Sequence, residues 1–129
     1  ANKMAQINLP NIARMSFINL FSEKSKEVFN SEIELALSEA LQTSLQGYSA
    51  CQEGMRTRPN RLSVLKNNHF KKMFILGEKD PVLPVKKGIK EAEETQSETV
   101  VLSGGHMSHI ENSDKLIKVL NTFIKRSLS

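Results

Sequence analysis

An aspartate and a histidine, Asp80 and His106, stand out because each one lies just past the end of a short apolar run that predicts a buried strand. These runs occupy residues 73–76 and 99–102. A carboxylate beside an imidazole can accept a hydrogen bond from one ring N–H, which fixes the tautomer. It also stabilises the imidazolium that forms when the other ring nitrogen takes a proton. The two residues are therefore candidates for general acid–base chemistry, with the aspartate orienting the histidine.

The segments around this pair predict a strand, a helix, a strand and a last helix. Both strands are apolar on consecutive residues, which is typical of strands that are covered on both faces. Pro84 is predicted to open the first of these helices, and Ser108 with Glu111 has the spacing of a capping box at the start of the last one. The stripe that the last helix is predicted to bury is Leu116, Ile117, Leu120, Phe123 and Ile124.

This order of elements indicates the α/β class, with the two strands parallel and adjacent. Open α/β sheets place their sites beyond the carboxyl ends of the strands, which is where Asp80 and His106 fall. Gly104 and Gly105 precede the histidine, and we expect them to let the backbone turn sharply there, with positive φ if the turn requires it.

Residues 1–67, in contrast, predict only helices. The signals that begin them are Pro10, then the capping boxes Ser31 with Glu34 and Thr43 with Gln46. The third of these helices is predicted to end at Pro59 and a short further one to occupy residues 61–66. The inward side of the third helix, which ends at Pro59, is predicted to consist of Tyr48, Cys51 and Met55.

Two parallel strands leave unpaired backbone groups at the edges of the sheet, and such a small sheet is rarely stable by itself. We therefore expect further strands from one of two sources. Either an N-terminal half precedes this chain, or copies of the chain join their sheet edges in a homo-oligomer.

Two motifs resemble the last third of α/β-hydrolase-fold enzymes. They are Gly-x-x-Asp-Pro-x-x-Pro at residues 77–84 and Gly-His-x-x-x-x-Glu at residues 105–111. Residues 50–61 are similar to the end of the helical lid of many members. The resemblance implies a C-terminal part of that fold. Residues 1–67 would form the lid and residues 68–129 the end of the core.

In that family the residues that match Asp80 and His106 are the acid and the base of a Ser–His–Asp triad. The resemblance thus implies a catalytic role for both, in an esterase-like acyl hydrolase that acts on a small-molecule substrate. It implies no cofactor. A non-catalytic relative, which uses the same fold to bind a ligand or a protein partner, is the alternative.

The nucleophile of such a triad is not evident in this chain. The family's Gly-x-Ser-x-Gly elbow is absent, and Ser49 and Cys51, in the nearest similar string, lie in a helical pattern rather than after a strand. Because the family's chain order is Ser, Asp, His, we expect the nucleophile and the oxyanion donors to precede Ala1. The chain alone is then expected to be inactive.

Composition excludes several other classes of function. A formal net charge of +4, with lysines and glutamates interleaved, argues against a nucleic-acid-binding surface. No apolar run approaches the roughly 20 residues that cross a membrane. The single cysteine excludes an internal disulfide framework and fits a reducing, cytoplasmic location. His109 lies three residues after His106, but without a third ligand nearby in the sequence a metal site is not predicted.

Overall fold

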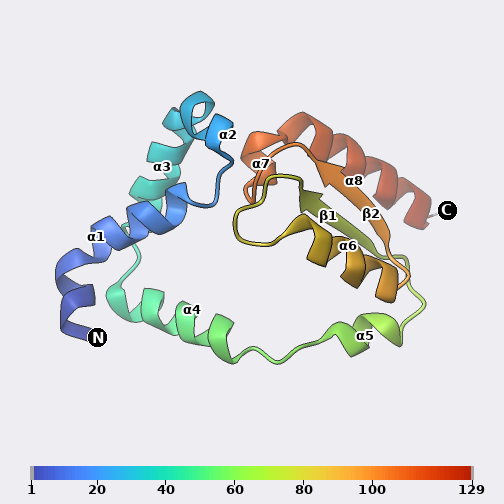
Figure 1. The fold of residues 1–129 in the computed structure, drawn as a ribbon, viewed down its shortest axis with the longest axis horizontal. Helices are drawn as coiled ribbons and strands as arrows, with labels where there is room; N and C mark the ends of the chain where they lie inside the picture. The colour runs from blue at the N-terminus through green and yellow to red at the C-terminus, as the bar shows by residue number, and fades with distance from the viewer. Residues whose placement is uncertain (1, 129) are drawn as a thin grey trace.

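The computed structural model describes the backbone of residues 2–128 and the side chains of residues 10–128 (Figure 1). The described chain is mixed α/β, with eight helices and one sheet of two strands. The helices before the sheet are α1 (Asn2–Ile18), α2 (Glu23–Val28), α3 (Asn30–Ala40), α4 (Leu45–Thr57) and α5 (Leu62–Lys66). The remaining elements are β1 (Met73–Gly77), α6 (Val85–Glu94), β2 (Glu98–Leu102), α7 (Ser108–Glu111) and α8 (Ser113–Leu128).

The sheet is parallel, as the sequence predicted, and its register runs from Met73 opposite Glu98 to Gly77 opposite Leu102. Helix α6 connects the strands, and Figure 1 shows α6 and α8 on opposite sides of them. A β-carbon on Gly88 of α6 would lie 2.5 Å from a methyl group of Leu76, so glycine lets this helix approach β1 closely. The predicted strand–helix–strand unit is therefore confirmed.

The first three helices form a small cluster around Phe21, Ile33 and Leu37, which are all buried. Two predictions were wrong here. Pro10 lies inside α1 instead of opening it, and α3 begins after Phe29 without a side-chain cap. Glu34, expected in a capping box, instead forms an exposed ion pair with Arg14, with 2.7 Å between Nη1 and Oε1. A long-range partner thus replaces the local one.

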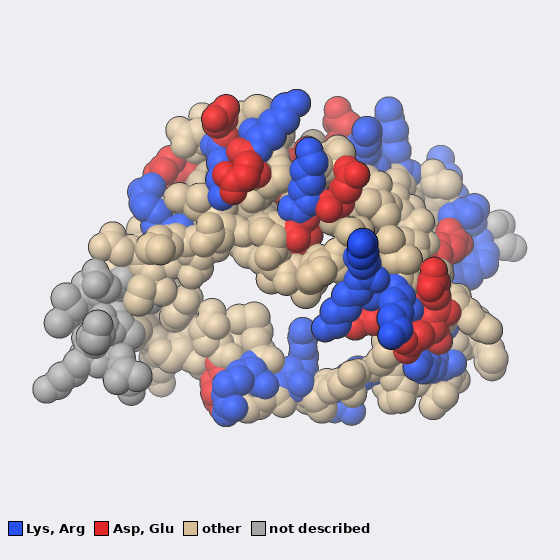
Figure 2. Space-filling view, viewed as in Figure 1, with Lys and Arg blue, Asp and Glu red and all other residues tan. Residues whose placement is uncertain are grey.

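Helix α4 stands apart from this cluster. Its N-cap is Ser44, whose hydroxyl accepts a hydrogen bond from Gly47 N, so the predicted cap at Thr43 was one residue early. The prediction that Cys51 and Met55 face inward was wrong, because both are exposed and α4 has no buried residue. Figure 2 shows openings between this part of the chain and the rest of the molecule.

The C-terminal region forms two helices, α7 and α8, where the sequence predicted one, and the break falls at Asn112. The predicted buried stripe was partly wrong. Ile117, Leu120 and Ile124 are 56%, 39% and 52% exposed, whereas Leu116 and Phe123 are half-buried. Two strands offer too narrow a surface to cover one whole face of α8. Among residues 2–128, no helix combines the length and apolar character that a membrane span requires.

Candidate active site

Asp80 lies in the turn after β1, and the two oxygens of its carboxylate have different partners. Oδ1 accepts hydrogen bonds from Val82 N at 2.8 Å and Leu83 N at 2.9 Å, which closes the turn. Oδ2 lies 2.8 Å from Nδ1 of His106, in the loop after β2. The hydrogen bond predicted between Asp80 and His106 is thus present. Because Oδ1 is held by its own loop, Oδ2 has a fixed direction toward the ring.

The electrostatics of this contact favour an ionised aspartate. Only 8% of the Asp80 side chain is exposed, and this burial, the largest single influence, acts to raise its pKa. The hydrogen bonds from Leu83 N, from the His106 ring and from Val82 N together outweigh it. The pKa of Asp80 is therefore lowered from its ordinary value, and the carboxylate can act as the acceptor that orients an imidazole.

The loop after β2 presents His106 through close backbone contacts. His106 N donates to Leu20 O at 2.8 Å, and Lys79 N donates to Gly104 O at 3.0 Å. A β-carbon on Gly77 would lie 2.1 Å from Gly105 O. No glycine among the described residues has positive φ, so the expectation of a left-handed turn here was wrong. The glycines instead allow the loops that carry Asp80 and His106 to touch.

The arrangement leaves one ring nitrogen available. With Nδ1 directed at the carboxylate, the neutral ring carries its proton on Nδ1, and Nε2 is the basic position. The His106 side chain is 34% exposed, and Nε2 has no hydrogen-bond partner in the described part of the chain. The pair can therefore accept a proton from an incoming group at Nε2 and return it in a later step.

The other residues considered from the sequence are not brought to this pair. Ser49 and Cys51 are exposed on α4, which Figure 1 shows well away from the loops after β1 and β2. His109 is exposed on α7. Within the described residues, no group of three His, Cys, Asp or Glu side chains could hold a metal ion. Hence Asp80 and His106 are the candidates that the structure joins.

Sequence reasoning missed the role of Glu111 in this site. The predicted capping box with Ser108 was wrong, because α7 has no side-chain cap. The Glu111 carboxylate instead accepts hydrogen bonds from the backbone N–H groups of Ser22, Gly105 and Met107 at 3.0, 2.9 and 3.1 Å. The Gly-His-x-x-x-x-Glu spacing was the one signal in the sequence that linked Glu111 to the His106 loop. The contact with Ser22 could not be predicted from spacing, because it joins residues 89 apart.

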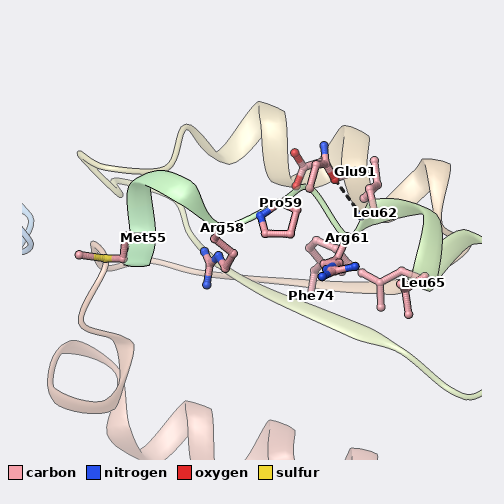
Figure 3. A pocket seen from close by; sticks show the side chains of 10 residues that line it. Met55, Arg58, Pro59, Arg61, Leu62, Leu65, Phe74 and Glu91 are labelled. Atoms are coloured by element: carbon pink, nitrogen blue, oxygen red, sulfur yellow. Dashed lines mark hydrogen bonds between the residues drawn. The ribbon is translucent and has the colours of Figure 1, made fainter. Parts of the chain in front are cut away.

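A cavity of about 640 Å³ lies elsewhere (Figure 3). It is bounded by the connection between α4 and α5, including Arg58 and Pro59, by Leu62 of α5 and by Phe74 of β1. Neither Asp80 nor His106 lines it. It is a groove beside the sheet, whereas the candidate catalytic pair lies beyond the carboxyl ends of the strands. Geometry and chemistry, rather than size, therefore identify the candidate site.

Comparison with known proteins assigns neither a family nor a function to this site. No protein-family model matches the chain, and no curated protein is significantly similar to it.

Proposed function

We propose that this chain supplies the acid and the base of a serine-type α/β-hydrolase that cleaves a carboxylic ester or a similar acyl bond. The observation that carries the proposal is the 2.8 Å contact between Asp80 Oδ2 and His106 Nδ1, beyond adjacent parallel strands. The resemblance of residues 77–84 and 105–111 to the end of α/β-hydrolases supports the same reading.

In this proposal His106 Nε2 removes the proton from a serine hydroxyl as the hydroxyl oxygen attacks the acyl carbon. The resulting imidazolium is stabilised by Asp80, which remains ionised. His106 then returns the proton to the leaving alcohol, and the acyl group stays on the serine. Water repeats the sequence and releases the acid. The lowered pKa of Asp80 suits its part, because a protonated carboxyl could not stabilise the imidazolium.

The serine and the oxyanion donors are proposed to come from polypeptide outside this chain that pairs with its sheet. Two features support this. Nε2 of His106 has no hydroxyl or thiol partner among residues 10–128, and the described sheet has a single strand pair with two free edges. Exposed apolar side chains near the sheet, such as Val101 at 45% and Phe70 at 54%, also suit coverage by further chain.

The test is an assay of the complete gene product with a short-chain activated ester. We expect a fluorophosphonate probe to label one serine in it. Asp80→Asn should lower kcat by about 10⁴-fold, and His106→Gln by about 10⁶-fold, because the base is lost outright. His109→Gln, an exposed histidine three residues away, is the matched control and should keep parental activity. Equal activity of the His106→Gln and His109→Gln proteins would refute the proposal.

A further inference from the structure

Glu111 is a buried acid whose carboxylate accepts hydrogen bonds from residues around the catalytic pair rather than from Asp80 or His106. The residue is 9% exposed, and its two carboxylate oxygens face different segments. Oε2 accepts from Gly105 N and Met107 N, and Oε1 accepts from Ser22 N in the turn between α1 and α2. The acid therefore joins the loop of the candidate base to the N-terminal helices.

The backbone of His106 lies in the middle of these contacts. Gly105 N and Met107 N, on either side of it, both donate to Glu111. His106 N itself donates to Leu20 O, which also belongs to the turn after α1. Three successive N–H groups are thus held from outside the loop, two of them by one carboxylate. The backbone position of a residue sets the starting point and the allowed rotamers of its side chain. These contacts therefore fix the Cα–Cβ bond of His106, from which the imidazole extends.

The chemistry of the acid fits this task. Burial, the largest influence, acts to raise the pKa of Glu111, but the hydrogen bonds from Ser22 N, the Ser25 hydroxyl, Gly105 N and the Ser22 hydroxyl outweigh it and lower that pKa. The group is therefore ionised and accepts on both oxygens. A glutamine has only one acceptor oxygen, and its NH₂ group would face an N–H donor on one side.

The space around the loop is equally restrictive. A β-carbon on Gly105 would lie 2.7 Å from Ser22 N, and one on Gly104 would lie 2.8 Å from Cβ of Glu111. The loop, the acid and the α1–α2 turn are consequently in direct contact, so a displacement of one moves the others.

We infer that Glu111 is a positioning residue, which fixes the His106 loop against the α1–α2 turn and thereby directs the imidazole at Asp80. The inference rests on the proposed function, since it assigns a residue that acts through the proposed base. It further means that the orientation of the N-terminal helices controls the geometry of the catalytic pair.

The test follows two signals by NMR in the 129-residue chain. The first is hydrogen exchange at the Ser22 amide, which reports the contact with Glu111. The second is the set of His106 ring signals, including the low-field Nδ1 proton expected from its hydrogen bond to Asp80. The variant is Glu111→Gln. Its matched control is Glu93→Gln on α6, an exposed glutamate.

We expect Glu111→Gln to remove the protection of the Ser22 amide, to abolish the low-field proton and to shift the ring signals of His106 toward those of the exposed His69. Glu93→Gln should change neither signal. If the Ser22 amide is released while the His106 signals stay parental, Glu111 is merely structural and the inference is overturned.

Two further variants keep the test decisive. If Glu111→Gln does not fold, Ser25→Ala removes one hydroxyl from the acid, together with its hydrogen bond to the Ser22 hydroxyl, and should shift both signals in the same direction by less. A folded Ser25→Ala protein with a released Ser22 amide and parental His106 signals overturns the inference. Asp80→Asn should abolish the low-field proton without releasing Ser22. If it leaves the ring signals unchanged, the proposed catalytic pair fails, and the positioning role fails with it.

Discussion

A β-carbon placed on Gly77 would lie 2.1 Å from the carbonyl oxygen of Gly105, so the end of β1 and the loop that carries His106 meet backbone to backbone. The obstructing atom belongs to the main chain and cannot rotate away as a side chain could. Glycine at position 77 is therefore a condition for bringing Asp80, three residues later, to the histidine.

We expect Gly77→Ala to destabilise the fold by about 1–3 kcal/mol or more, because the loop must shift to admit the methyl group. Gly54→Ala is the matched control. Gly54 lies inside α4, and nothing lies within 4 Å of the added carbon, so this change should stabilise the helix by about 0.5–1 kcal/mol. Urea unfolding of both variants measures the difference. Equal effects of the same sign would contradict the contact between the loops.

The lowered pKa of Asp80 predicts a pH-dependent share of stability. Its pKa in the folded chain lies below the ordinary value of 3.8. Ionised Asp80 therefore stabilises the fold fully above that value, and this contribution is lost as pH falls through the folded pKa. The parent should lose stability relative to Asp80→Asn as pH falls from above the ordinary pKa of 3.8 to well below it. Urea midpoints against pH for both proteins provide the measurement, and parallel curves would exclude the effect.

The free sheet edges and the exposed stripe of α8 predict self-association of the isolated chain. We expect sedimentation velocity to show dimers or larger species whose population rises with concentration. Ile124→Lys, at a position that is 52% exposed, should weaken this association. Asn121→Lys places the same charge on an exposed polar position of α8 and should not. A chain that stays monomeric at every concentration, with sharp thermal unfolding, would refute the expectation that the free sheet edges cause association.

Catalysis by the isolated 129-residue chain is expected to be absent, because no nucleophile contacts His106 among the described residues. The assay uses a short-chain activated ester and the purified chain. Turnover that His106→Ala abolishes would show that the chemistry needs no further polypeptide. A weak signal that persists after this substitution would instead indicate nonspecific hydrolysis or a contaminating enzyme.

The local part of this structure could be predicted from the sequence. The apolar runs identified both strands, and Pro84 marked the start of α6. Asp80 and His106 could be paired from sequence because adjacent parallel strands end at one edge, where the structure joins their side chains at 2.8 Å. These predictions depend on neighbours in sequence or on one strand pairing.

Several of the predictions that failed depend on distant partners. Glu34 and Glu111 both had the spacing of capping-box residues, but Arg14 and the amide of Ser22 bind them instead. Sequence spacing shows which contacts a side chain can make nearby, but not which distant group competes for it. The prediction of a buried stripe on α8 failed for a related reason. Its spacing predicts an apolar face, whereas the surface that would cover Ile117 depends on the width of the sheet.

The hydrogen bond between Ser22 N and Glu111 has a consequence for the order of folding, because it spans 89 residues. Closing a long loop costs chain entropy, whereas β1, α6 and β2 can form from segments that are close in sequence. The strand pair should therefore appear early. During synthesis, Ser22 leaves the ribosome long before its carboxylate partner exists, so the His106 loop can be secured only after almost the whole chain has been made. The sheet, and with it Asp80, should therefore be in place before His106 is oriented, since the orientation of this histidine is among the last features to be fixed.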